Sequence, residues 1–446
     1  MSTQPATGGT LRRVTISFAW LLADRGMRLV GGFAVGLWLA RYLGPADFGL
    51  LSAATAATWI GVVATQMGLD GLVQREFVLH PGNTGRILGT VTILGSATAL
   101  VVWSSLAVLA FFTADDPVLR TLLLWLGLLA VPQALSAWEY LFQARSDLRP
   151  VVIGQNICFV LCLAARAGAI KLEAPVTAFA IIAVAERLLG ALVVIIWAHR
   201  RHDCDRLTFD PALARAMVRE SWPVWISALL VTLYQKIDLI LIARWKSEAD
   251  AGIYAAAMRI VDLWWSISTI AATAILPDLM RSSRESTNYT AVLQRYLDLS
   301  AVLAMSAALA MTVVASLLVR LLFGEAYAGA SGILIIQFWA GVFVFLSVAR
   351  ARHLIAIKRR GVELWFSVLG VALNLGLNAF LIPRYGAWGA AWAGFTTQGT
   401  VALIYPWFFA DTRDIAAREW LALAAPLRHA GTASRWCSTR LRGKSG

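Results

Sequence analysis

The chain contains 446 residues, of which 59% are hydrophobic and only 15% are charged, and its formal net charge is +13. Soluble domains are about 45–50% apolar and about 25% charged, so this composition, with a mean hydropathy of +0.68, excludes an ordinary soluble protein. The basic residues lie in short loops between apolar runs and not on one soluble face, which argues against a nucleic-acid partner.

Twelve apolar stretches follow one another along the chain, and each reaches the roughly 20 residues that a membrane-spanning helix needs. Turn residues such as Gly44-Pro45 and Asp116-Pro117 lie in the breaks between them. The sequence therefore predicts an all-α integral membrane protein with about twelve transmembrane helices. The predicted spans are 15–40, 48–72, 87–113, 119–143, 150–171, 175–198, 221–244, 252–276, 292–319, 330–351, 362–382 and 387–409.

The first apolar stretch follows Arg12-Arg13 and superficially resembles a secretion signal. It contains Asp24, Arg25 and Arg28, however, and continues to about residue 41, whereas the apolar part of a signal peptide is short and uncharged. We therefore interpret it as the first spanning helix.

The distribution of lysine and arginine predicts the orientation in the membrane. With the N-terminus inside, the inner segments carry 24 of the 39 basic residues and the outer segments carry 7. Because cytoplasmic loops are enriched in lysine and arginine, this asymmetry predicts cytoplasmic termini and an even number of spans.

A short internal repeat predicts two similar halves. Ala40-Arg41-Tyr42, followed by Asp47-x-Gly49, returns as Ala243-Arg244-Trp245, followed by Asp250-x-Gly252, at a constant offset of 203 residues. Both copies follow the first helix of a six-helix half, and parallel repeats of this kind are common in transporters.

These features predict four parts: an N-terminal lobe (1–198), a cytoplasmic linker (199–219), a C-terminal lobe (220–410) and a basic cytoplasmic tail (411–446). Two interpretations of the tail stay open. It either lies on the anionic inner leaflet or is disordered.

Several motifs resemble those of a known transporter family. The run from Ala40 to Leu51 resembles the segment after the first helix of polysaccharide-repeat exporters, and three later stretches resemble the same family in the same order: 238–254, 322–327 and 378–391. These exporters are the Wzx-like O-antigen and capsule flippases of the multidrug/oligosaccharidyl-lipid/polysaccharide (MOP) exporter superfamily. The resemblance covers about residues 12–410.

The resemblance implies the MOP fold, with two six-helix lobes working by alternating access. It also implies a flippase for an undecaprenyl-diphosphate-linked oligosaccharide in exopolysaccharide, O-antigen or capsule assembly. The expected partners are this lipid-linked substrate, membrane lipids, and a polysaccharide polymerase with its export machinery. No cofactor is expected.

The charged residues of the first helix are the first candidates for substrate binding. Charges at membrane depth cost about 2.5–3.5 kcal/mol each on insertion scales, so they should be paired or line water. Asp24 and Arg28 are four residues apart and can pair along one helix face. Arg25 is then left over, three residues from Arg28 and on the same side of the helix. Two guanidiniums facing a cavity suit a diphosphate, because arginine binds phosphate oxygens with two parallel hydrogen bonds. The alternative is a structural ion pair and a second arginine that reaches the membrane surface.

Charged residues in other helices extend this set. Lys236 and Arg259 are further candidates for the diphosphate. The acidic residues are candidates for ion pairing or for coupling to a proton or cation: Asp24, Glu186, Asp238 and Asp262. For each of these, a structural ion pair is the competing interpretation.

The repeated outer loops are candidates for a gate, in which Arg41 would pair with Asp250 and Arg244 with Asp47. Four other charged residues lie near helix ends, where long side chains reach the membrane surface. We assign them no function: Glu139, Arg166, Arg350 and Arg352.

Two other functions were compared with the flippase. A multidrug/cation antiporter of the same fold should offer a mainly acidic and aromatic cavity, yet the first helix has two arginines and one aspartate. A membrane glycosyltransferase or polysaccharide polymerase should carry a sizeable outer loop, and the outer loops here are short. The sequence has no HExxH motif, no phosphate-binding glycine loop and no cysteine–histidine spacing typical of a metal site.

Overall fold

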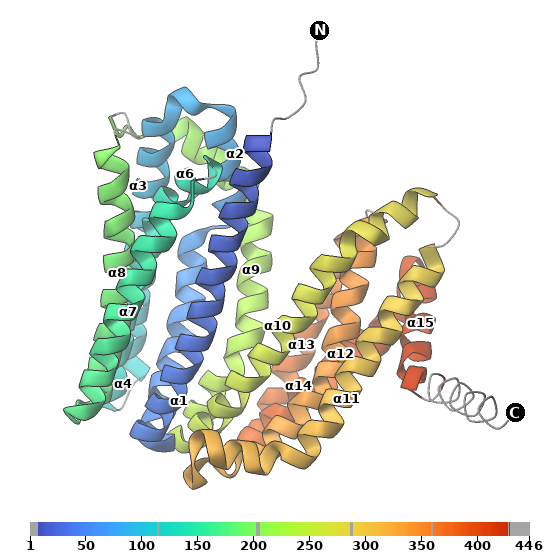
Figure 1. Ribbon diagram of the computed structural model, residues 1–446. Helices are drawn as coiled ribbons and strands as arrows, with labels where there is room; N and C mark the ends of the chain where they lie inside the picture. Colours follow the sequence, from blue (N-terminus) through green and yellow to red (C-terminus); the bar gives the residue numbers. More distant parts are fainter. Residues whose placement is uncertain are drawn as a thin grey trace, which may run out of the picture. The chain divides into compact units, whose positions relative to one another are not determined.

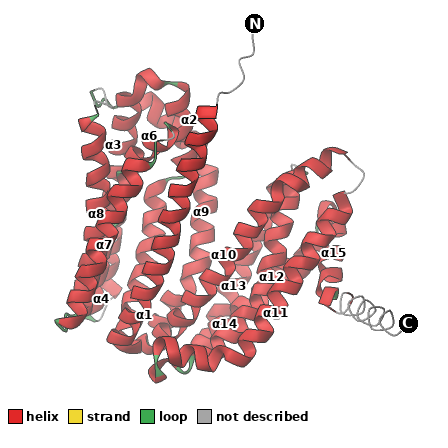
Figure 2. Cartoon of the chain, viewed as in Figure 1, coloured by secondary structure: helices red, strands yellow, loops and turns green. Residues whose placement is uncertain are grey.

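The computed structural model describes residues 8–113, 116–145, 147–201, 206–285, 289–357, 360–426 and 428. In residues 8–30 and 280–285, and at some scattered positions, only the backbone is described. All regular structure in these ranges is helical (Figure 2).

Contacts within the chain define two units, Met1–Ile240 and Leu241–Gly446. The helices of unit 1, with α9 running into unit 2, are α1 (Gly8–Gln66), α2 (Asp70–Leu79), α3 (Thr84–Thr113), α4 (Pro117–Gly127), α5 (Ala130–Ala134), α6 (Ala137–Ala144), α7 (Arg149–Lys171), α8 (Val176–Arg200) and α9 (Pro211–Trp245) (Figure 1). The helices of unit 2 are α10 (Glu248–Glu285), α11 (Tyr289–Phe323), α12 (Ala330–Ala356), α13 (Arg360–Tyr385), α14 (Ala387–Leu403) and α15 (Arg413–Leu423).

Nine stretches of the described residues are long and apolar enough to cross a membrane. The first of them, Gly31–Leu79, contains the second predicted span and the end of the first, because α1 continues past Gly44. The two remaining predicted spans correspond to α10, which is interrupted by charged residues, and to α14, which has 17 residues. The prediction of an all-α membrane protein with about twelve spanning helices is confirmed.

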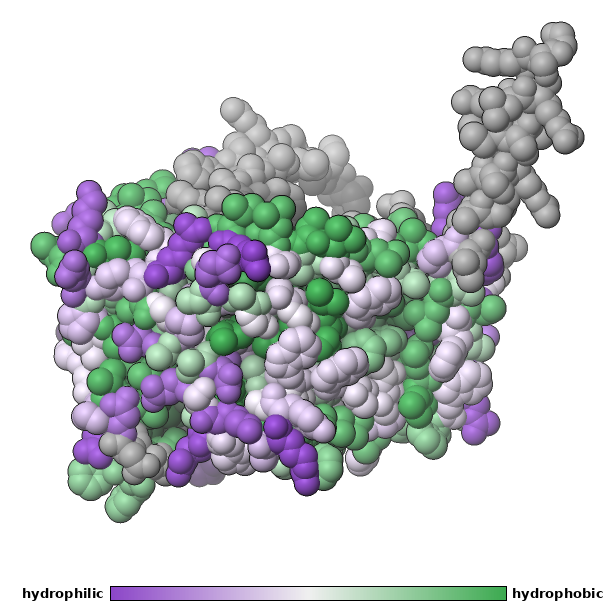
Figure 3. All heavy atoms as spheres, turned by 90° about the horizontal axis from the view of Figure 1, so that it is seen from below, coloured by the Kyte–Doolittle hydropathy of each residue, from purple (hydrophilic) through white to green (hydrophobic). Residues whose placement is uncertain are grey.

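Large apolar side chains are exposed along the helices of both units, among them Phe112, Ile270 and Val313, which are 79%, 67% and 83% exposed. On the face shown in Figure 3, hydrophobic groups cover much of the surface and hydrophilic groups gather in patches among them. Exposed apolar surface of this extent indicates contact with lipid or with another protein, and lipid is the natural partner of spanning helices.

A helical segment begins at each copy of the sequence repeat. In the first copy Gly44 has φ +72°, a conformation that glycine adopts without strain, and Pro45 begins the next helical segment, where its missing N–H is not needed. In the second copy the Ser247 hydroxyl accepts a 3.0 Å hydrogen bond from the N–H of Asp250 at the start of α10. Asp47 and Asp250 therefore both occupy the third position of a helix, where a carboxylate interacts favourably with the helix dipole.

The contacts divide the chain within α9, between Ile240 and Leu241 and thus beyond the end of the predicted 199–219 linker. The middle of this linker packs against α3 within unit 1: the N–H of Asp210 donates to Thr90 Oγ1 at 3.0 Å, and its carboxylate pairs with Arg86. The boundary between two moving lobes stays a prediction.

Candidate functional site

The fourth predicted span is not one helix. It is broken into α4, α5 and α6, with Pro132 in the short central piece. At the breaks several N–H groups donate to the carbonyl three residues earlier, as in Leu128 to Trp125 and Leu135 to Pro132. Broken helices at membrane depth occur where the backbone is buried in protein or lines a cavity.

A polar cavity of about 230 Å³ lies beside this break in unit 1. Its wall combines two carboxylates, an arginine, three glutamine side chains and two aromatic rings. The lining residues are Trp59, Val62, Gln66, Leu129, Pro132, Gln133, Ser136, Glu139, Tyr140, Gln155, Glu186, Arg187, Gly190 and Ala191. Drug-sized pockets measure about 300–1,000 Å³, so this cavity is too small for an oligosaccharide with its lipid diphosphate.

Glu186 is the predicted coupling residue that the structure places in this cavity. Its Oε2 accepts a 2.7 Å hydrogen bond from Nη2 of Arg166 on the neighbouring helix α7, and the two side chains are 12% and 16% exposed. The adjacent Arg187 also lines the cavity. The interpretation of Arg166 as an arginine that reaches the membrane surface is wrong, because its guanidinium turns inward to neutralise Glu186.

Glu139 is a second carboxylate in the cavity, and the sequence interpretation assigned it no function. It accepts a hydrogen bond from the side-chain amide of Gln155 on α7. The signal that sequence reasoning missed was the position of Glu139 just after Pro132, since a broken helix brings polar groups to a cavity at membrane depth.

The structure does not describe the side chains of Asp24, Arg25 and Arg28. All three lie on α1, but outside the residues whose side chains are described. Their proposed contact with a diphosphate stays a prediction.

The remaining candidates are distributed over both units. On α9, Asp238 is buried and Lys236 is half-buried; on α10, Arg259 is half-buried and Asp262 is exposed. Since Lys236 and Arg259 belong to different units, their convergence on one substrate stays a prediction.

The four gate candidates lie at the starts and ends of helices. Arg41, Asp47 and Arg244 are exposed, whereas Asp250 is half-buried. Asp250 packs on Gly386, where an added Cβ would lie 3.2 Å from its Oδ2. The described geometry thus gives each aspartate a role within its own unit, and pairing between the repeated loops stays a prediction.

Comparison with known proteins identifies the class to which this fold belongs. A solved multidrug resistance transporter of the MATE family and MOP superfamily, in its inward-facing conformation, superposes with a TM-score of 0.68 at 14% identity, over 88% of this chain and 95% of that one. The Lipid II flippase MurJ in its inward closed conformation gives a TM-score of 0.65 at 14% identity, over 88% and 90% of the two chains. The fold is that of the MOP-superfamily transporters, as predicted.

The sequence itself then identifies the family. A profile described as polysaccharide biosynthesis protein matches residues 38–332. The chain belongs to this family, and the two solved proteins whose fold it shares are a transporter and a flippase. A "probable low-salt glycan biosynthesis flippase Agl15" of Haloferax volcanii is 25% identical over 206 residues, which are 46% of this chain and 44% of that protein. The match therefore spans less than half of that relative.

Proposed function

We propose that the protein is a flippase that moves a lipid-linked oligosaccharide from the inner to the outer leaflet of a bacterial inner membrane by alternating access. The observation that carries this proposal is the match to a polysaccharide biosynthesis family on the same fold as a solved Lipid II flippase. The cargo would be an undecaprenyl-diphosphate-linked repeat unit for exopolysaccharide, O-antigen or capsule. Both termini would be cytoplasmic, as the basic residues predict.

The arginines of α1 would bind the diphosphate while the lipid tail stays in the bilayer. Arg25 and Arg28 supply two planar forks that match phosphate oxygens, with Lys236 and Arg259 as further cationic groups. An anionic head group that moves outward is assisted by the inside-negative potential, by about 2.3 kcal/mol per charge per 100 mV.

The cavity of unit 1 would supply coupling instead of cargo binding. It is too small for the oligosaccharide, and its carboxylates already have partners that stabilise them: Arg166 for Glu186 and Gln155 for Glu139. A proton or cation that binds Glu186 competes with Arg166, so occupancy of the cavity would change how α7 and α8 pack. Asp238 and Asp262 stay candidates for the same role.

A cation antiporter is the second candidate, favoured by the likeness to the MATE-family transporter. An antiporter for organic cations would have to accommodate its substrate near Arg25 and Arg28. The excess of positive charge on α1 favours an anionic head group instead.

Reconstitution distinguishes the two functions. The protein is inserted into vesicles that contain a fluorescent undecaprenyl-diphosphate oligosaccharide, and a membrane-impermeant glycosidase reports the fraction of substrate in the outer leaflet. We expect faster exchange between leaflets than in protein-free vesicles. Uptake of ethidium against a proton or sodium gradient, without movement of the lipid, would support the antiporter and contradict the flippase.

A further inference from the structure

The start of the predicted tail is a docked helix. α15 (Arg413–Leu423) packs on α11 and α14 and buries Ile415, Ala416 and Ala422. Thr412, the residue before this helix, is bonded to the preceding segment, since its hydroxyl donates to the carbonyl of Pro406 at 2.7 Å. Of the two interpretations of the tail, disorder is wrong for residues 413–423.

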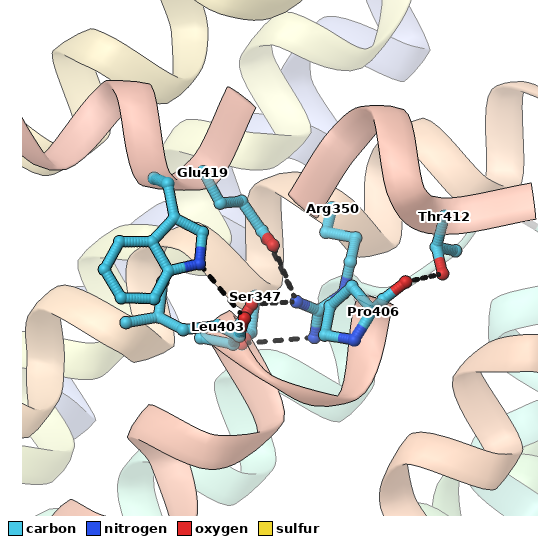
Figure 4. Close-up of polar contacts among 8 residues, drawn as sticks. Ser347, Arg350, Leu403, Pro406, Thr412 and Glu419 are labelled. Atoms are coloured by element: carbon cyan, nitrogen blue, oxygen red, sulfur yellow. Dashed lines mark hydrogen bonds and ion pairs between the residues drawn. The ribbon is translucent and has the colours of Figure 1, made fainter. Parts of the chain in front are cut away.

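The centre of the docked face is an ion pair between α12 and α15. Nη1 of Arg350 lies 2.9 Å from Oε1 and 3.2 Å from Oε2 of Glu419, and both side chains are 0% exposed. From its position near a helix end, Arg350 was expected to reach the membrane surface. This expectation is wrong, because the side chain is fully buried. It points into the junction between helix ends, toward Glu419 and Ser347 (Figure 4).

Arg350 connects α15 to three other helices. Its Nη1 also donates to the carbonyl of Ala402 on α14 at 3.2 Å, and its Nη2 donates to Ser347 Oγ at 3.4 Å. Its guanidinium lies 4.7 Å from the ring centre of Phe366 on α13, a distance at which a cation–π interaction is favourable. The middle of α15 and the ends of α12, α13 and α14 therefore meet at one side chain.

The fifth helix of this junction, α11, is tied to α15 separately. Nε2 of Gln294 donates to the carbonyl of Arg418 at 3.3 Å and to Asp298 Oδ1 at 2.8 Å. The same Asp298 oxygen accepts a 2.8 Å hydrogen bond from Arg428, beyond the end of α15. The backbone of α15 and the Arg428 side chain that follows it thus hold α11 as well.

A wholly buried ion pair has a distinctive energetic signature. Removal of one partner leaves an uncompensated charge away from water and is strongly destabilising, whereas replacement of both partners by apolar residues is often neutral. For α15 to leave its site, both charges would have to separate, so the pair favours a helix that stays docked.

We propose that α15 is a fixed brace of unit 2, positioned by Arg350, which makes the ends of α11, α12, α13 and α14 move as one block. This inference goes beyond the proposed function, because it concerns how the unit is held together and not what it carries. It assigns the first part of the tail to the transport machinery.

Cross-linking measures the docking of α15. Thr290 on α11 and Arg418 on α15 are close, since Nη1 of Arg418 lies 3.5 Å from the carbonyl oxygen of Thr290. Both are replaced by cysteine in the full chain, after the native cysteines are changed to serine, and a short bis-maleimide joins them in membranes while Gln294 stays in place. We expect efficient cross-linking, and we expect the joined protein to move lipid in the vesicle assay as fast as the unjoined protein. Loss of transport on cross-linking would overturn the brace, because it would show that α15 must move.

Substitutions test the role of the ion pair. We expect Glu419→Ala to abolish most cross-linking and to lower the amount of protein in the membrane, and we expect Glu419→Met with Arg350→Met to restore both. Asp414→Ala is the matched control, since it removes an exposed carboxylate of the same helix, and it should behave as the parent protein. Full cross-linking in Glu419→Ala would overturn the proposal. Cross-linking and abundance require no substrate, so they stand even if the protein carries another cargo.

Discussion

Among the residues whose side chains the structure describes, two inward-turned arginine–glutamate pairs have different surroundings. Arg166 and Glu186 join neighbouring helices of unit 1 at 2.7 Å, and Glu186 lines a polar cavity. Arg350 and Glu419 join α12 to α15 at 2.9 Å in unit 2, and neither side chain is exposed at all. The same two residue types therefore form one pair that a proton or cation can reach and one that is sealed. Access to water, and not the identity of the residues, separates a candidate coupling site from a structural tie.

The largest effect should come from breaking the sealed pair. Arg350→Ala leaves the Glu419 carboxylate buried and unpaired, which should destabilise the protein by about 3–5 kcal/mol. Arg166→Ala is the matched variant in unit 1, and Glu186 can there turn to the cavity, so its loss should be about 1–3 kcal/mol. Thermal unfolding of the two variants in detergent measures the difference. Equal losses would show that the two pairs do not differ in access to water.

The second effect concerns transport and not stability. Arg25→Ala and Arg28→Ala should each abolish movement of the lipid while the protein stays in the membrane, and lysine should restore it only in part because it lacks the two-pronged fork. The vesicle assay gives the rate, and an immunoblot gives the amount of protein.

The double variant Asp24→Asn with Arg28→Gln separates phosphate binding from charge neutralisation. If Arg28 serves only to neutralise Asp24, then removal of both charges should restore abundance and transport together. A stable protein that moves no lipid supports phosphate binding. Normal transport by this variant would make Arg28 a structural residue, like Arg350.

Hydropathy predicted the fold because the membrane imposes its length on each helix separately. The repeat could also be read from a few neighbouring residues. The structure explains it, because Asp47 and Asp250 each lie in the first turn of a helix. The pairs Arg166–Glu186 and Arg350–Glu419 could not be predicted from short stretches of sequence, because their partners lie 20 and 69 residues apart in the chain. A single charge in each of two apolar segments is a signal that they pair, but only the packing of the helices decides which residues meet.

A smaller effect on transport should come from the open pair. Glu186→Gln keeps a hydrogen-bond acceptor for Arg166, so stability should change little, but the side chain can no longer bind a proton or cation. If Glu186 couples transport to an ion, the dependence of the rate on that ion gradient should fall at least about fivefold, the lower end of ordinary coupling energies. Glu139→Gln is the control, since Glu139 lines the same cavity and accepts a hydrogen bond from the neutral Gln155. If the rate of Glu186→Gln depends on the ion gradient as in the parent protein, Glu186 does not couple transport to that ion and its pair with Arg166 is structural, as is Arg350–Glu419.

The smallest effect should come from the repeated aspartates, where both units present the same residue in the same position. Asp47→Asn and Asp250→Asn remove a carboxylate from the first turn of a helix, so each should destabilise its unit by about 0.3–1 kcal/mol. If the aspartates act only within their own units, exchanging the charges of the two loops cannot restore what the single substitutions lose. If they form the gate, then Asp250→Arg should slow transport and Arg41→Glu should restore it, because the exchanged pair attracts again. The vesicle rates of the two single variants and of the double variant decide between these cases. If Arg41→Glu restores the transport rate of Asp250→Arg, the repeated loops form a gate. If the losses of transport rate in the two single variants add in the double variant, the aspartates act only through the dipoles of their own helices.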